Sequence, residues 1–172
     1  MNDARSTGVG LTCAGLPAGA LDDFLTAETI AEIAQSFWDA FLPDDAVLLP
    51  GSTLPANEEV RGRIDIGGSW SGSVELSCSL AAARRIAAAM FSLSSDALEV
   101  SDVHDAVGEL VNVVGGNIKS ILPAPTSLSV PTVGDEAGEW RFAATLEHEV
   151  LLDWRGEPVV VRVWRAAGPA TS

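Results

Sequence analysis

Three polar residues near the middle of the chain have types and a spacing that could support chemistry. Asp105, Glu109 and Asn112 follow one another at intervals of four and three residues. In a helix, where each residue turns about 100°, these three and Gly116 fall within an arc of roughly 60°. A carboxylate and a carboxamide one turn apart are an unusual pair for a solvated helix face, which commonly carries Lys and Glu in pairs.

The element that must position these residues is a long helix over residues 101–122. Its apolar residues recur at steps of four and three, which is typical of a helix with one buried face. They are Val103, Val107, Leu110, Val114, Ile118 and Ile121. Ser101 is the expected N-cap, and Asp102 and Asp105 stand in the first turn, where the helix dipole favours negative charge. The polar arc is expected on the opposite, exposed side.

Gly115 and Gly116 interrupt this helix with two residues of poor helix propensity. Each costs about 1 kcal/mol relative to Ala, so something must compensate. One interpretation is close packing against a neighbouring element, and the other is close approach of a partner. The plain alternative for the polar arc is that Glu109 and Asn112 are ordinary solvated side chains, because most exposed polar residues carry no chemistry.

Composition limits the classes of function. The 172 residues predict one domain over residues 23–168, after a tail over residues 1–22. The net charge of -14 argues against nucleic acid and anionic membranes as partners. The sequence contains no run of 18 apolar residues, so no membrane span is expected. Cys13 and Cys78 form no metal or disulfide pattern, and a cytoplasmic protein without a metal site is expected.

The remaining elements alternate in a simple order. A helix is expected over residues 26–42, strands over 60–67 and 69–80 with a Gly67-Gly68 turn between them, and a helix over 81–91. Extended segments follow over residues 126–133, 139–147 and 159–164, and residues 150–154 either extend the second or form a strand of their own. This order predicts an α+β fold, a layered sandwich with helices packed on one face of a mostly antiparallel sheet.

Two other groups of polar residues have ordinary explanations. Glu32 and Gln35, in the first expected helix, have the same spacing as Glu109 and Asn112 but end in a glutamine. An ordinary exposed helix face explains them. His104 lies about 140° from Glu109 around the helix, so we do not place it in the same site. His148 stands between two glutamates and is expected to be solvated.

The motif Asp105-x3-Glu109-x2-Asn112, with the later segment Leu128-Ser-Val-Pro131-Thr-Val, resembles the CheC/CheX/FliY family of chemotaxis phosphatases. The resemblance is strongest to single-site, CheX-like domains, and it covers most of the chain from Asp23 to Trp164. The interval from Asn112 to Pro131 is shorter than in the family pattern. CheX-like domains share the layered α+β architecture, and dimers that form through sheet edges are common among them.

The resemblance implies a phosphatase that acts on the aspartyl-phosphate of a CheY-type response-regulator receiver domain. Asn112 would orient the attacking water and Glu109 would pair with the receiver's lysine, supported by Asp105 and Pro131, while Gly115 and Gly116 would admit the receiver's loops. Mg²⁺ would belong to the receiver, so the chain would need no cofactor of its own. Two alternatives stay open: a non-catalytic adaptor that binds a receiver or another signalling protein through the same helix, and a structural dimer with a vestigial site.

Overall fold

The computed structural model describes residues 25–42, 49–50, 60–134 and 144–167. The expected tail over residues 1–22, Cys13 and the first part of the strand predicted at 139–147 lie outside these ranges. The helices are α1 (Ala27–Phe41), α2 (Leu80–Phe91), the short η2 (Ser95–Ala97) and α3 (Val100–Ile121). The strands are β1 (Leu49–Pro50), β2 (Val60–Gly68), β3 (Gly72–Cys78), β4 (Thr126–Leu128), β5 (Thr132–Gly134), β6 (Ala144–Trp154) and β7 (Glu157–Ala166).

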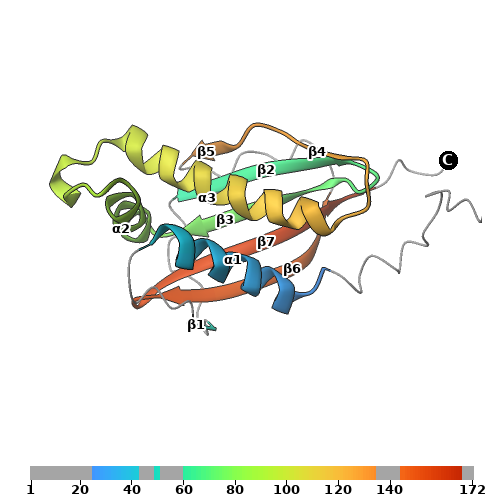
Figure 1. Ribbon diagram of the computed structural model, residues 1–172, viewed down its shortest axis with the longest axis horizontal. Helices are drawn as coiled ribbons and strands as arrows, with labels where there is room; N and C mark the ends of the chain where they lie inside the picture. Colours follow the sequence, from blue (N-terminus) through green and yellow to red (C-terminus); the bar gives the residue numbers. More distant parts are fainter. Residues whose placement is uncertain (1–24, 43–48, 51–59, 135–143, 168–172) are drawn as a thin grey trace, which may run out of the picture.

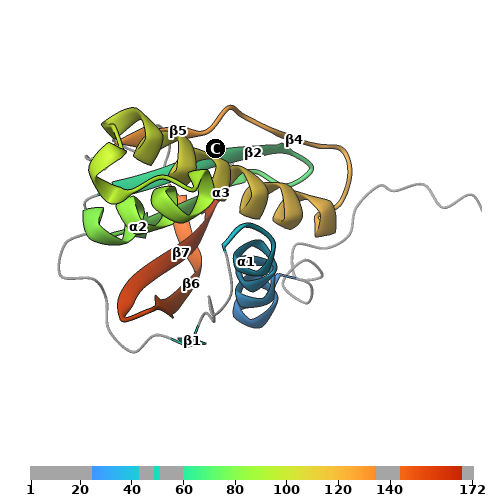
Figure 2. The ribbon, with the colours of Figure 1, turned by 60° about the vertical axis from the view of Figure 1, so that its left-hand side comes forward.

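One antiparallel sheet carries the helices, as the sequence predicts for an α+β layered sandwich. Its strand order is β1-β6-β7-β3-β2-β4, and β5 also pairs with β2, so β4 and β5 share one edge. Figure 1 shows α1 and α3 side by side across one face of the sheet, and Figure 2 shows α2 near the start of α3. The broad prediction of the fold class is therefore confirmed.

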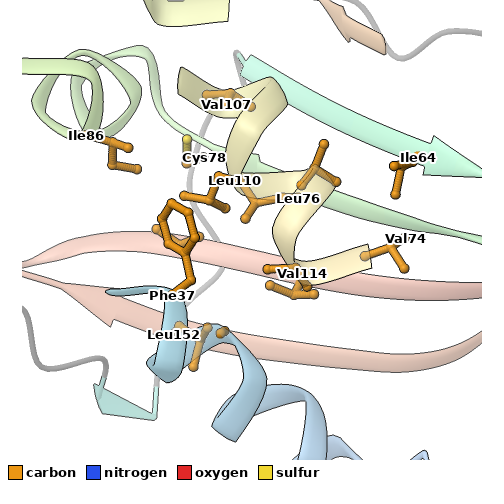
Figure 3. Close-up of a cluster of buried hydrophobic side chains, with 14 of the residues drawn as sticks. Phe37, Ile64, Val74, Leu76, Cys78, Ile86, Val107, Leu110, Val114 and Leu152 are labelled. Atoms are coloured by element: carbon orange, nitrogen blue, oxygen red, sulfur yellow. The ribbon is translucent and has the colours of Figure 1, made fainter. Parts of the chain in front are cut away.

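The core lies between this helical layer and the sheet. Strands β2, β3 and β7 alternate, and the inward residue of each step is apolar and buried, as a sheet with one covered face requires. In Figure 3, Phe37 from α1 and Leu110 and Val114 from α3 meet Val74 and Leu76 from the sheet. Cys78 belongs to the same cluster, and burial raises the pKa of its thiol to about 12, with nearby Glu157 adding to the effect.

The opposite face of the sheet carries charged groups that form ion pairs. Arg162 on β7 lies between two carboxylates, with its Nη1 3.2 Å from Glu75 Oε1 and its Nε 2.8 Å from Glu149 Oε2. The same Nη1 donates to Ser77 Oγ at 3.1 Å. These groups lie on neighbouring strands, where opposite charges stabilise the cross-strand pairing.

Several predicted boundaries are correct and some are wrong. Helix α1 begins directly after Thr26, the first residue of the helix predicted over residues 26–42, and Thr26 is its N-cap, because its Oγ1 accepts a hydrogen bond from the Thr29 N–H at 3.1 Å. Helix α3 begins one residue earlier than predicted. Its N-cap is Glu99 and not Ser101, and the Glu99 N–H donates to Asp102 Oδ2 at 2.8 Å. A downstream carboxylate that returns to the cap residue therefore fixes the helix start.

The turn between β2 and β3 is also misplaced in the sequence prediction. Gly67 and Gly68 still belong to β2, where they pair with Ser127 and Thr126 of β4, and the chain reverses only at residues 69–71. The cause is Trp70, which is 2% exposed and folds against Gly72, where a Cβ atom would overlap its ring. Burial of an indole thus overrides the turn preference of the Gly-Gly pair.

The C-terminal strands differ from the prediction in their continuity. Residues 144–154 form one strand with an irregularity between Leu146 and His148, so residues 150–154 extend the preceding strand. Residues 126–133 form two strands with a break between them. Arg155 and Gly156 take positive φ angles of 55° and 81° and form the turn that joins β6 to β7.

Candidate functional site

The polar ridge of α3 is formed by Asp105, Glu109, Asn112 and Gly116. Asp105 and Glu109 are exposed, and Asn112 and Gly116 are half-buried. The ridge therefore lies on the outer side of the helix, as the 100° periodicity predicts. The two carboxylates are open to solvent, and the amide sits one turn further on, lower against the protein surface.

Close packing of α3 on β2 fixes the height of this ridge above the sheet. A Cβ atom on Gly62 would lie 2.9 Å from Val107 Cγ1, and a Cβ atom on Gly115 would lie 2.5 Å from Ile64 Cγ2. Each element thus contributes one glycine at a point where the other element approaches it. Such contacts leave no room for a side chain, so they set the helix-to-sheet distance.

Gly115 and Gly116 therefore have different surroundings. Gly115 is buried and faces Ile64, so this glycine allows close packing within the chain, the first of the two interpretations given for it. Its expected role in admitting a partner's loops is wrong, because a partner cannot reach a buried position. Gly116 stays on the ridge, and its nearest side-chain atom is Leu128 Cδ1 at 4.0 Å from an added Cβ. The sequence prediction treated the pair as one unit, although adjacent helical residues point about 100° apart.

The chain between β4 and β5 forms a wall beside the ridge. Residues 129–131 interrupt the pairing with β2, whose register runs from Ile66↔Leu128 to Arg63↔Thr132. Ser129 fixes this break, because its N–H donates to the Asp65 carbonyl at 2.9 Å and its Oγ accepts from the Asp65 N–H at 3.0 Å. The result is a bulge that is anchored at its first residue.

The next residue of the bulge, Val130, projects into solvent. It is 82% exposed, the largest exposure among the large hydrophobic side chains of the described residues. A single exposed apolar residue is common on protein surfaces. This one is held by an anchored backbone immediately before Pro131.

An open pocket of about 490 Å³ lies between the wall and the ridge. It is lined by His104, Asp105, Gly108, Glu109, Pro131 and Val133. The structure thus brings together three of the predicted site residues, Asp105, Glu109 and Pro131, although Pro131 follows Glu109 by more than twenty positions in the sequence. Asn112 continues the ridge beyond the pocket lining.

His104, Gly108 and Val133 were not predicted to belong to this site. His104 lies on the flank of α3 that faces the wall, so it lines the pocket although it points away from Glu109 around the helix. A Cβ atom on Gly108 would lie 3.5 Å from Val133 Cγ2, so this glycine also lets the wall approach. The Pro in the segment Leu128–Val133 was a signal for a break in the strand, because proline cannot donate to a sheet ladder.

The described residues show neither a metal-binding cluster nor a membrane-spanning helix. These residues contain no group of three or more His, Cys, Asp and Glu side chains that could hold a metal ion. Among the helices in the same ranges, none combines the length and apolar character needed to cross a bilayer.

Comparison with known proteins identifies the class to which this fold and site belong. Residues 60–149 match the family model described as chemotaxis phosphatase CheX, which covers more than half of the chain. The chain therefore belongs to the CheX family, as the spacing of Asp105, Glu109 and Asn112 suggested. The match includes α3, β4 and β5, and it does not include α1. No curated protein sequence matches the chain.

Solved structures share the fold at low sequence identity. The chemotaxis protein CheX from Vibrio vulnificus is 18% identical, with a TM-score of 0.66 over 83% of this chain and 96% of that chain. The CheX–CheY–BeF3–Mg²⁺ complex from Borrelia burgdorferi contains a chain that is 18% identical, with a TM-score of 0.61 over 83% of this chain and 99% of that chain. The FliM middle domain from H. pylori is 5% identical, with a TM-score of 0.54 over 88% of this chain and 94% of that chain.

Proposed function

We propose that the protein removes the phosphoryl group from the aspartyl-phosphate of a CheY-type receiver domain, with α3 as the docking element. One observation carries this proposal: Glu109 and Asn112 stand one helical turn apart on the outer side of α3, next to a pocket that Pro131 completes. Membership of a family of chemotaxis phosphatases supports it, and so does the relative that was solved together with CheY, BeF3 and Mg²⁺.

Hydrolysis of an aspartyl-phosphate breaks the bond between phosphorus and the aspartate oxygen and forms a bond from phosphorus to water oxygen. The aspartate returns as a carboxylate, and inorganic phosphate leaves with the water's oxygen. Such a reaction depends on positioning and charge stabilisation more than on covalent help from the protein. Asn112 supplies the positioning, because its carboxamide oxygen accepts a hydrogen bond from the water and holds it in line with phosphorus.

Glu109 fixes the complex in register. Its carboxylate is exposed, so it can leave bulk water and pair with the lysine of the receiver's active site. Asp105, one turn earlier, adds negative charge on the same side and lines the same pocket. Mg²⁺ belongs to the receiver in this scheme, and no residue of this chain is assigned to bind it.

The decisive experiment replaces the amide and follows phosphate loss from phosphorylated receivers of the same genome. Asn112→Ala should slow the catalysed loss at least about a hundredfold, a loss expected when one preorganised polar group is removed. Asn117→Ala is a matched control, because Asn117 is an exposed amide on α3 that points away from the ridge. Equal rates for the native protein and Asn112→Ala would remove Asn112 from the reaction.

A second experiment tests docking separately from chemistry. Glu109→Lys should weaken binding to a receiver loaded with Mg²⁺ and beryllium fluoride, because it places like charges together. Asp96→Lys changes the net charge equally, but Asp96 lies in η2 and does not line the pocket, so binding should be unchanged. Binding by a native protein that never accelerates phosphate loss would favour a non-catalytic adaptor.

A further inference from the structure

Lys119 stands on the same side of α3 as Asn112, and it is the only lysine in the sequence. Seven positions separate the two residues, so they differ by about 20° around the helix and by roughly 10 Å along its axis. Lys119 therefore stands in line with the polar ridge, beyond Gly116. Along this line the charge changes sign, from Asp105 and Glu109 near the start of α3 to Lys119 in its last turn.

The helix itself gives one ordinary reason for a cation at this place. The C-terminal end of a helix dipole is negative, so a lysine in the last turn stabilises the helix. This reason requires a positive charge near the end of α3, but the charge could stand on any side of the helix. Two further observations distinguish Lys119 from a cation that only stabilises its own helix.

The first observation is that Lys119 has no partner among the described residues, whereas the arginines there are all engaged. Each of these arginines has a hydrogen bond, an ion pair or a ring contact. They are Arg61, Arg63, Arg84, Arg85, Arg155, Arg162 and Arg165. The ammonium of Lys119 has no such contact with any group that the structure describes. This is unexpected in a chain whose 24 acidic residues outnumber 10 basic ones.

The second observation is that the side chain of Lys119 is held close to the protein. Lys119 is half-buried, whereas its neighbours Asn117 and Ser120 are exposed. A lysine in this situation lays its apolar stem along the protein surface and keeps its ammonium in water. Because the stem is already restricted, a partner that binds the ammonium removes less conformational freedom than it would from a fully exposed lysine.

From these observations we propose that Lys119 forms an ion pair with a carboxylate on the rim of the receiver's active site; the proposal rests on the function proposed for α3. The receiver supplies Mg²⁺, which proteins bind mainly through carboxylates, so the surface around its aspartyl-phosphate is acidic. This chain is acidic as well, with a net charge of -14, and the two surfaces repel each other. Lys119 is the only lysine or arginine in α3, and it offsets part of this repulsion.

The position of Lys119 assigns it to docking, because two helical turns separate it from the amide that positions the water. Glu109 and Lys119 lie on opposite sides of Asn112 along the helix, and they attract groups of opposite charge, a lysine and a carboxylate. These two contacts favour one orientation of α3 on the receiver. The reversed orientation is disfavoured, because it brings like charges together.

The test compares substitutions of Lys119 in the full chain, by calorimetry with a receiver that the native protein binds, loaded with Mg²⁺ and beryllium fluoride. Lys119→Gln should weaken binding about threefold to tenfold, and Lys119→Glu at least about tenfold. Lys119→Arg keeps the charge and should bind within about twofold of the native protein. The difference between the native protein and Lys119→Gln should shrink as salt is added, because salt screens exposed charges. A role confined to helix stability predicts no such salt dependence.

Arg155→Glu is the matched control for Lys119→Glu, because it changes the net charge by the same amount. Arg155 belongs to the turn between β6 and β7, which Figure 1 shows at the other end of the sheet from the last turn of α3. This control should leave binding unchanged. In steady-state dephosphorylation, Lys119→Gln should raise KM and leave kcat within about twofold of the native value, whereas Asn112→Ala lowers kcat.

The single lysine permits a direct identification of its partner. A carbodiimide joins an amine to a carboxylate as an amide and takes up the water that is released, whereas a guanidinium does not react. In the native complex this reagent should join Lys119 to an aspartate or glutamate of the receiver, and mass spectrometry of the digested product identifies both residues. Lys119→Arg should lose this product although it still binds the receiver.

The outcomes separate the two proposals. Native affinity in both Lys119→Gln and Lys119→Glu overturns the role of Lys119 and leaves the proposed function intact. Equal weakening by Lys119→Glu and Arg155→Glu also overturns it, because the effect then belongs to the net charge of the chain. A native protein that neither binds nor dephosphorylates any receiver overturns both proposals.

Discussion

Helices α1 and α3 present the same order of polar groups to solvent, but they rest on the sheet in different ways. Helix α3 approaches β2 through Gly62 and Gly115, each of which receives a side chain of the other element against its backbone. Helix α1 instead packs through aromatic rings: Phe37 meets Trp38 edge-on at 5.5 Å between ring centroids and stacks on Phe41 at 4.7 Å. The two helices therefore use different side chains to pack on the protein.

The difference shows what a site on such a helix requires. The wall of residues 129–131 stands beside the ridge of α3, and a pocket forms between them. A pattern of side chains on a helix is thus only part of a site, because neighbouring elements must complete it. Four substitutions, two of them with a matched control, test this comparison.

The largest effect is expected from removing the buried indole of α1. Trp38 is fully buried, so Trp38→Ala should lower the free energy of unfolding by about 3–5 kcal/mol. Phe41→Ala, at a position that is 45% exposed, should cost about 1 kcal/mol or less. Denaturant unfolding measures both. Equal losses would mean that the indole does not carry the packing of α1.

The next largest effect is expected at the close contact of α3. Gly115→Ala should destabilise the protein by about 1–3 kcal/mol, because the new methyl group would overlap Ile64. The gain in helix propensity is smaller than this loss. An unchanged or raised unfolding free energy would show that α3 can lift from β2 without cost, and the contrast with α1 would then fall.

A smaller effect is expected at the wall. Val130→Ser should leave stability within about 0.5 kcal/mol, since the side chain is 82% exposed. It should weaken binding of a phosphorylated receiver by about tenfold if the bulge takes part in docking. Val100→Ser, at a position that is 65% exposed and outside the pocket, is the matched control. The same affinity for both variants would exclude the wall from the interface.

The smallest effect on stability is expected at Gly116, and it has the opposite sign. Gly116→Ala should raise the unfolding free energy by up to about 1 kcal/mol, because the position is helical and an added Cβ meets nothing closer than 4.0 Å. If a partner approaches the ridge here, the same variant should dephosphorylate the receiver more slowly. A stabilised protein with native activity would show that Gly116 is not needed for docking.

Sequence alone could predict the parts of the fold that depend on local patterns. The stripe from Val103 to Ile118 was placed correctly in the core, because helical periodicity is set by neighbours within the same element. Its last predicted member, Ile121, is wrong, because it stands at the end of α3 and is 37% exposed. The ridge of Asp105, Glu109 and Asn112 followed for the same reason. Local patterns failed where distant contacts decide, as at Gly67-Gly68, where the burial of Trp70 and the pairing with β4 move the turn.

The completion of the site could not be predicted for the same physical reason. His104 and Gly108 belong to the pocket only because residues 129–133 lie along their side of α3, and that placement depends on pairing of β4 and β5 with β2.

The pairing of β3 with β7 at the centre of the sheet has a consequence for how the chain reaches its native state. Cys78 lies opposite Val159, so the two halves join through contacts between residues far apart in sequence. Closing so long a loop costs chain entropy before any of these contacts can stabilise the structure. Folding therefore becomes slower as the share of long-range contacts increases. During synthesis, α1 and the β2–β3 hairpin must wait for the last strand before the middle of the sheet can assemble.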